Sequence, residues 1–157
     1  MTREEKFMME AIQLSRQGVA NNEGGPFGCV IVKNDVIVGR GNNKVTSTND
    51  PTAHAEVTAI RDACRNLGTF QLDGCEVYTS CEPCPMCLGA IYWARPKVVY
   101  FANHRQDAAD IGFDDSMIYD EMAADLHTRK IPIISIGRET ALKVFEEWRD
   151  KGDKTLY

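Results

Sequence analysis

Short β-rich runs alternate with amphipathic helical segments, and this alternation limits the possible folds more than any other feature of the chain. The predicted strands are Phe27–Val32, Val36–Gly41, Cys75–Thr79, Val98–Ala102 and Ile131–Ile136. The predicted helices are one opened by a capping box at Thr2 and Glu5, one from Asp50-Pro51-Thr52 to Leu67, then Cys84–Arg95, Met117–Leu126 and Thr140–Arg149. Strands that alternate with helices predict an α/β domain of three layers, α/β/α, with the later strands parallel.

Two segments need a separate prediction. Phe27–Val32 and Val36–Gly41 flank Lys33-Asn34-Asp35, which is a hairpin signal. Both faces of the first run are apolar, so it is expected to be a covered, central strand. Asn103–Lys130 is acidic and less regular, and it is either a solvated connector or a functional lid or binding loop.

Composition sets the class of protein. The 157 residues carry a formal net charge of −5, which disfavours a duplex nucleic-acid binder because such proteins carry a basic stripe. The first residues are charged and no apolar segment follows them, so no secretory signal is expected. No apolar run approaches the length of a membrane span. A cytoplasmic protein with no membrane partner is therefore expected, in which thiols stay reduced. Its six cysteines must serve packing, metal binding or catalysis.

A group of candidate ligands lies at the starts of two predicted helices. His54 begins one helix, and Cys84 and Cys87 begin another. Imidazole and thiolate groups are the ligands that zinc prefers, and three protein ligands leave a fourth position for water, as in catalytic sites. Both helix starts carry positive dipole charge, which favours thiolates. Glu56, two residues after His54, is a carboxylate that can move a proton to and from such a water.

These residues carry a resemblance to a known family. The pattern His54-x-Glu56 followed by Pro83-Cys84-x-x-Cys87 is similar to the signature of the zinc-dependent, cytidine-deaminase-like base deaminases. The resemblance covers most of the chain and implies one domain over residues 1–157, with a five-stranded mixed sheet flanked by helices. Within the family the guanine deaminase branch is the closer match. The matching stretches are 24–28, 50–56, 84–94, 112–116 and the terminal Tyr157.

The resemblance implies a role for each matching residue. It implies that His54, Cys84 and Cys87 hold one Zn²⁺ per subunit with a catalytic water, and that Glu56 moves protons while guanine is hydrolysed to xanthine and ammonia. The substrate-binding residues that it implies are Asn43, Ala55, Phe27, Trp93, Asp115 and Tyr157. It further implies a homodimer in which residues 140–157, a helix and tail, are exchanged between subunits.

The chemistry of guanine suits two of these residues. Guanine presents N1–H and its 2-amino group as donors on one edge, and an ionised carboxylate such as Asp115 only accepts. Adenine has no donor at its ring N1, so an acidic residue suits it poorly. The amide of Asn43 can pair with donor or acceptor atoms elsewhere on the base, and such polar contacts reject analogues that lack them.

Several alternatives stay open at this stage. Cys81 forms a second C-x-x-C pair with Cys84 and could be a ligand, whereas Cys29, Cys64 and Cys75 are expected to be packing residues. Either Asp114 or Asp115 could be the acidic residue that meets the substrate. Phe27 and Trp93 could be ordinary core residues. A deaminase acting on adenosine in a transfer-RNA loop is the second function, although the charges of the C-terminal tail cancel. A non-enzymatic zinc module, closed by Cys81, is the third.

Overall fold

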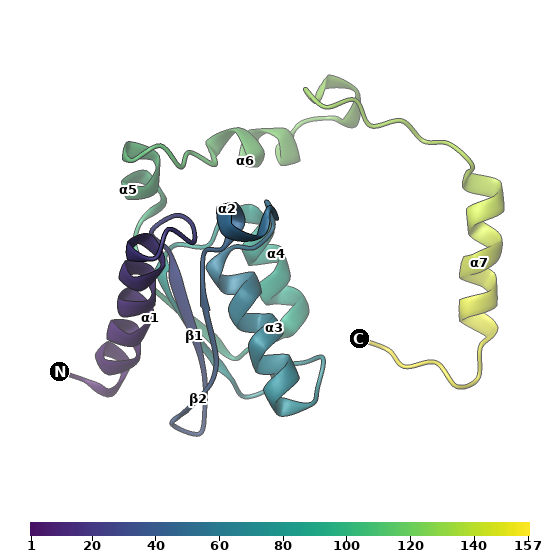
Figure 1. Cartoon of the computed structure of the whole chain (residues 1–157). Coiled ribbons are helices and arrows are strands. Elements are labelled where there is room, and N and C mark those ends of the chain that lie inside the picture. The colour runs from purple at the N-terminus through teal and green to yellow at the C-terminus, as the bar shows by residue number, and fades with distance from the viewer. The chain divides into compact units, whose positions relative to one another are not determined.

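The computed structural model describes all 157 residues, and they form two compact units, Met1–Asp115 and Ser116–Tyr157 (Figure 1). The first unit contains every strand and most of the helices. The second contains helices and irregular chain only. Each unit is described by itself.

A mixed four-stranded sheet is the centre of the first unit, with strand order β2-β1-β3-β4. The strands are β1 (Gly28–Lys33), β2 (Val36–Asn42), β3 (Glu76–Cys81) and β4 (Val98–Asn103). β1 pairs antiparallel with both β2 and β3, whereas β3 and β4 are parallel. Asn34 and Asp35 both have positive φ in the β1–β2 hairpin, as a two-residue type I′ turn requires. The predicted hairpin, the central position of its first strand and the parallel later pair are confirmed.

Helices cover both faces of this sheet (Figure 1). Helix α1 (Arg3–Ala20) packs on one face, where Ala11 joins a buried cluster with Val30, Val32 and Tyr78. Helices α3 (Ala55–Leu67) and α4 (Pro85–Ala94) pack on the other face, over a larger buried cluster. The three-layer α/β/α prediction is thus confirmed, and the predicted capping box at Thr2 opens α1.

Helix α3 begins later than predicted, and the later start puts His54 at the N-terminus of the helix. The sequence suggested a start at residues 50–52, but Asp50 instead accepts two hydrogen bonds from Thr52, through its backbone N–H and its hydroxyl. This Asx turn competes with helix formation. His54 therefore becomes the N-cap residue of α3. Two further short helices, α2 (Val45–Thr48) and α5 (Arg105–Asp110), were not predicted.

The second unit differs from the sequence prediction in two respects. It consists of α6 (Ser116–Ala123), a 3-10 turn (Leu126–Thr128) and α7 (Arg138–Asp150). The prediction of a strand at Ile131–Ile136 is wrong for this chain, because the segment is irregular, and the sheet has four strands, not five. The amphipathic pattern of the last helix also predicts that Phe145 and Trp148 point inward, and this is wrong, since α7 contains no buried residue. Within the single chain this unit offers these residues nothing to pack against.

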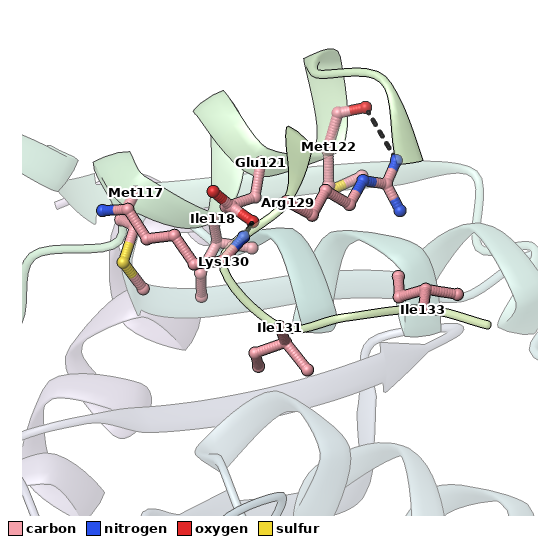
Figure 2. A pocket seen from close by; sticks show the side chains of 8 residues that line it. All are labelled: Met117, Ile118, Glu121, Met122, Arg129, Lys130, Ile131 and Ile133. Atoms are coloured by element: carbon pink, nitrogen blue, oxygen red, sulfur yellow. Dashed lines mark hydrogen bonds between the residues drawn. The ribbon is translucent and has the colours of Figure 1, made fainter. Parts of the chain in front are cut away.

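A shallow hollow of about 250 Å³ lies between α6 and the chain that follows the 3-10 turn (Figure 2). Met117, Ile118, Met122 and Ile131 give it an apolar lining. Arg129 donates a hydrogen bond to the Met122 carbonyl at 3.4 Å, which links the chain after the 3-10 turn to the end of α6. None of the helices in either unit combines the length and the apolar character needed to cross a membrane.

Candidate metal centre and active site

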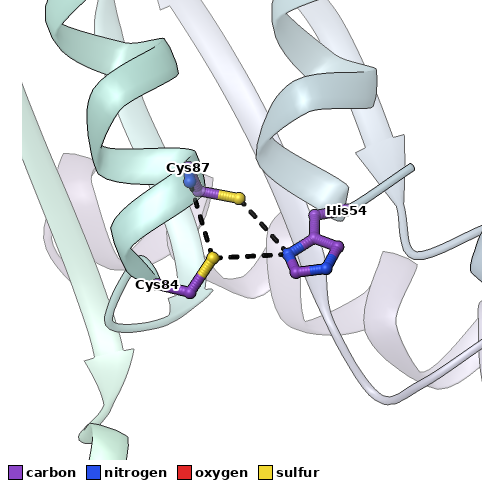
Figure 3. A group of neighbouring side chains, drawn as sticks. All are labelled: His54, Cys84 and Cys87. Atoms are coloured by element: carbon purple, nitrogen blue, oxygen red, sulfur yellow. Dashed lines mark hydrogen bonds between the residues drawn. The ribbon is translucent and has the colours of Figure 1, made fainter. Parts of the chain in front are cut away.

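The three predicted zinc ligands lie together where α3 and α4 begin (Figure 3). His54 Nδ1 is 3.5 Å from the Sγ atom of Cys84 and 3.5 Å from the Sγ atom of Cys87. Cys84 is the N-cap residue of α4, and Pro85 occupies the first turn of that helix. Figure 3 shows the imidazole and both sulfurs pointing toward one another from the two helix starts.

The dimensions of this group fit a zinc ion. Zinc–sulfur bonds of about 2.3 Å and zinc–nitrogen bonds of about 2.0–2.1 Å at a tetrahedral angle place sulfur and nitrogen about 3.5–3.6 Å apart. The observed separations of 3.5 Å match this value for both cysteines. One imidazole and two thiolates also form the donor set of a three-ligand zinc site, which leaves one position for water or substrate.

The electrostatics of the group favour a thiolate at Cys84 and a thiol at Cys87. The hydrogen bond with Cys87 and the nearby imidazole of His54 lower the pKa of Cys84 to about 4, although burial opposes the shift. The hydrogen bond to Cys84 and burial raise the pKa of Cys87. The contact with Cys84 likewise raises the pKa of His54. The N-terminal dipoles of α3 and α4 add positive potential at the same point.

Glu56 lies in the first turn of α3 and is buried, with 6% of its surface exposed. The hydroxyl of Thr79, which is buried in β3, donates a hydrogen bond to Glu56 Oε1 at 2.9 Å. Burial raises the pKa of Glu56, and the hydrogen bond from Thr79 opposes that shift. A carboxyl group whose pKa is raised toward neutrality is suited to both accepting and returning a proton.

The backbone fixes the orientation of the Asn43 amide. The side chain is buried, and its Oδ1 atom accepts hydrogen bonds from the N–H groups of Gly25 at 3.3 Å and Val45 at 3.1 Å. Both lone pairs of that oxygen are therefore used, which leaves the NH₂ group as the part of the amide able to meet a ligand. A Cβ atom on Gly24 would lie 2.2 Å from Asn43 Oδ1, so only glycine fits there.

Phe27 and Asp115 lie in the first unit with the metal group. The ring of Phe27 meets that of Phe113 edge to face at 5.0 Å, and Phe27 also packs against the buried cluster under α3. Burial and the charge of Cys84 raise the pKa of Asp115. Asp115 is half-buried whereas Asp114 is exposed, so of the two acidic residues Asp115 is the better placed to meet a ligand.

The remaining predicted substrate residues have different positions. Ala55 is fully buried beside His54 in the first turn of α3. Trp93 lies in the last turn of α4, six residues and about 9 Å along the axis from Cys87, and it is 64% exposed. Tyr157 belongs to the second unit and is 71% exposed. Their roles toward a substrate stay predictions.

The other cysteines lie outside the metal group. The Cys81 thiol is buried and faces the carbonyl oxygen of His104 at 3.9 Å, and burial raises the pKa of Cys81 to about 11. Cys29 and Cys75 are buried in the core cluster between the sheet and α3, and Cys64 packs against it. None of the six forms a disulfide.

Three residues around the site have roles that were not predicted from the sequence. Thr79 lies on the face of β3 that also carries the apolar residues Val77 and Cys81. A polar residue between two apolar ones on the same face was the sequence signal that could have indicated a functional role. Phe113 was visible only as the residue preceding Asp114 and Asp115. The steric role of Gly24 follows from the path of the chain past Asn43, which no local pattern reports.

Comparisons with known proteins agree with this geometry. Residues 1–103 match the family model of the cytidine and deoxycytidylate deaminase zinc-binding region. The guanine deaminase of Bacillus subtilis (strain 168) is 54% identical over 153 residues, which are 98% of this chain and 98% of that protein. Its X-ray structure matches with a TM-score of 0.95 and covers 98% of both chains.

More distant relatives match only part of the chain. The tRNA-specific adenosine deaminase of Aquifex aeolicus (strain VF5) is 41% identical over 98 residues, which are 62% of this chain and 64% of that protein. A solved structure that holds 2,6-diaminopurine is 33% identical, with a TM-score of 0.69, and the match covers 71% of this chain and 62% of that one.

Proposed function

Because the chain belongs to the cytidine and deoxycytidylate deaminase family of zinc-binding domains, we propose that it hydrolyses guanine to xanthine and ammonia. The observation that carries the proposal is the buried carboxylate of Glu56 beside the group of His54, Cys84 and Cys87. A ligand set that leaves one position open, next to a carboxylate able to move protons, is the arrangement that hydrolytic deamination of a base requires.

One Zn²⁺ per subunit would be held by His54, Cys84 and Cys87, whose separations fit tetrahedral coordination. When bound, zinc supplies a water of lowered pKa and therefore a nucleophile near neutral pH. The two helix N-termini stabilise the thiolate ligands. Because the metal requires deprotonated ligands, its binding near neutral pH would release the proton of Cys87.

Glu56 is the proton carrier in this proposal. Its carboxylate takes the proton of the attacking water as the new C2–O bond forms, and delivers that proton to N3 of guanine. The intermediate then loses its 2-amino group, and Glu56 passes the second proton of the water oxygen to the departing amine. Guanine and water are consumed, and xanthine and ammonia leave. Burial, which raises the pKa of Glu56, makes its carboxylate a stronger base for taking each proton from the water oxygen.

Recognition of the purine is divided between donor and acceptor groups. The NH₂ group of Asn43 donates to acceptor atoms of the base such as O6 or N7, since its oxygen is held by Gly25 and Val45. The carboxylate of Asp115 accepts from the N1–H edge of guanine. Phe27, supported by Phe113, would pack on the ring, and Ala55 and Trp93 stay candidate substrate residues on the family resemblance.

Adenosine in a transfer-RNA loop is the weaker substrate proposal. The tRNA-specific relative from Aquifex aeolicus aligns with 62% of this chain, whereas the guanine deaminase relative aligns with 98%. In the C-terminal helix and tail, Lys143, Arg149, Lys151 and Lys154 are balanced by Glu146, Glu147, Asp150 and Asp153. A clamp for RNA phosphates would need a net positive face there.

A closed, non-enzymatic zinc module is the other alternative, and two observations disfavour it. Cys81, the residue that would close the coordination sphere, lies outside the metal group and faces the His104 carbonyl. A closed module also gives no purpose to the buried Glu56, whose charged form is costly in the protein interior.

A homodimer with exchanged C-terminal segments is part of the proposal. Residues 140–157 and the apolar run at 131–136 find no cover within their own unit, for Ile134 is 81% exposed and Phe145 is 73% exposed. A second copy of the chain would bury these side chains, and exchange of a terminal element is a low-cost route to a dimer. Tyr157 would then close the substrate pocket of the partner. Six cysteines without disulfides suit a cytoplasmic location.

Substitution of Glu56 by Gln tests the catalytic proposal. The amide keeps the shape of the side chain but cannot carry the protons, so kcat for guanine should fall by roughly 10²- to 10⁴-fold. Zinc content, measured by elemental analysis, should remain at one ion per chain. A Glu56→Gln variant that holds zinc and turns guanine over at the wild-type rate would overturn the proposed role.

A further inference from the structure

Thr79 is a buried polar residue on the otherwise apolar face that β3 presents to α3 and α4. Its neighbours on that face, Val77 and Cys81, are buried apolar residues, and Cys29 lies opposite Thr79 on β1. A hydroxyl buried in such surroundings costs free energy unless it finds a partner. Thr79 is 1% exposed, and the partner of its hydroxyl is Glu56 Oε1, at 2.9 Å.

The direction of this hydrogen bond has a consequence for the chemistry. A carboxylate oxygen only accepts, so the Thr79 hydroxyl donates to Oε1. The donation engages Oε1 and restrains the carboxylate plane, so Oε2 is the oxygen that Thr79 leaves available for proton transfer. Thr79 comes from the central strand β3, whereas Glu56 comes from the first turn of α3. The bond therefore ties the carboxylate to a rigid element other than its own helix.

We propose that Thr79 is a positioning residue, whose hydroxyl holds Glu56 Oε1 so that Oε2 is the atom that receives and returns the proton. The inference rests on the proposed role of Glu56. Thr79 itself is not the proton carrier and needs no contact with substrate. Because a displacement of about 1 Å can cost roughly 100-fold in rate, release of the carboxylate should be visible in kcat.

Thr79→Val is the direct test, because valine keeps the shape of threonine and removes only the hydroxyl. We expect kcat for guanine to fall roughly 10- to 100-fold, with KM changed less than about threefold and zinc content unchanged. Thr79→Ser retains a hydroxyl and should restore kcat to within about fivefold of the wild type. A purely structural role would give a stability loss in both variants without this separation of kcat from KM.

Ser80→Ala is the matched control from the next residue of the same strand. Its hydroxyl is also buried, but it accepts a hydrogen bond from the Gly28 N–H and does not bond to Glu56. The variant should lose thermal stability yet keep kcat within about threefold of the wild type. An equal loss of kcat in Ser80→Ala and Thr79→Val would contradict the specific role of Thr79.

A readout independent of turnover comes from the thermal unfolding of the metal-free chain. Thr79→Val should lower Tm more in the wild-type background than in Glu56→Leu, because only in the former does it remove a hydrogen bond from a buried carboxylate. Equal Tm losses, or a Thr79→Val enzyme with wild-type kcat, would overturn the inference. Glu56→Gln, assayed in parallel, separates the two proposals, since its retention of activity would reject the role of Glu56 itself.

Discussion

The two units of this chain contain a similar proportion of apolar residues but use them in opposite ways. In Met1–Asp115 the sheet and its three covering helices enclose two buried clusters, and the starts of α3 and α4 meet at the metal group. In Ser116–Tyr157 no helix has a buried residue. The first unit therefore builds both its core and its ligand group from its own residues, whereas the second has apolar faces that its own residues do not cover.

The largest expected effect lies wholly in the first unit. Cys84→Ser removes a soft thiolate from a set of three ligands, so bound zinc and guanine deamination should both fall below detection in elemental analysis and in an ammonia assay. Cys81→Ser, in the same segment but outside the metal group, should keep one zinc per chain. The reverse pattern would move the ligand assignment to Cys81.

A somewhat smaller effect tests whether the second unit contributes to chemistry. Removal of residues 155–157, which include Tyr157, should lower kcat/KM for guanine by roughly 10- to 100-fold, because the pocket of the partner loses its closing residue. Zinc content and dimer mass, measured by light scattering, should be unchanged. Glu146→Gln, on the exposed surface of α7, is the control. Wild-type kinetics after the truncation would remove the tail from the site.

Gly24→Ala should act on substrate binding with the metal group intact. Its Cβ atom would lie 2.2 Å from Asn43 Oδ1 and 2.5 Å from the Asn43 carbonyl oxygen, so the amide must move. We expect KM for guanine to rise by about tenfold, which is close to the effect of losing one hydrogen bond to the substrate. The zinc content should not change. Gly152→Ala adds the same methyl group in open space and should change nothing. An unaltered KM in Gly24→Ala would contradict the assigned orientation of Asn43.

The smallest expected effect concerns the stability of the first unit alone. Burial would raise the pKa of Glu76, but hydrogen bonds from Tyr78, Arg3 and Lys97 outweigh it and lower that pKa to about 2. Because the folded pKa lies below the unfolded value of about 4.3, the stabilisation is present above pH 4.3 and is lost as the pH falls toward 2.

Glu76→Gln should therefore lower the free energy of unfolding at pH 7 by about 2 kcal/mol, the usual contribution of hydrogen bonds to a charged group. The difference from the wild type should shrink between pH 4.3 and pH 2 in denaturant titrations. A difference that is independent of pH would show that the ion pairs around Glu76 contribute nothing.

The sequence was informative where residues act through their own local structure. The capping box at Thr2, the Asn34-Asp35 turn and the start of the helix that carries Cys84 depend on neighbouring residues, and the structure has each of them. The strand predicted at Ile131–Ile136 depends on a pairing partner that its own unit does not supply, so its β-rich composition was not sufficient.

In the candidate site, too, some residues could be predicted from the local sequence and others could not. His54, Cys84 and Cys87 were predictable because zinc chemistry demands their types and spacing, and the structure brings them together. The hydrogen bond of Thr79 to Glu56 joins residues 23 positions apart in sequence, and the restriction at Gly24 depends on Asn43 in another loop. Such contacts are set by tertiary packing, which no local pattern encodes.

The most direct test of the account is ammonia release by the zinc-loaded chain from guanine, adenine, cytosine, cytidine and a transfer-RNA anticodon loop, measured in parallel with Glu56→Gln as the blank. The account predicts that guanine gives equal amounts of xanthine and ammonia, with kcat/KM at least roughly 100-fold above that of every other substrate. Faster release from adenosine in the RNA loop, or no release from guanine by a chain that holds one zinc ion, would contradict it.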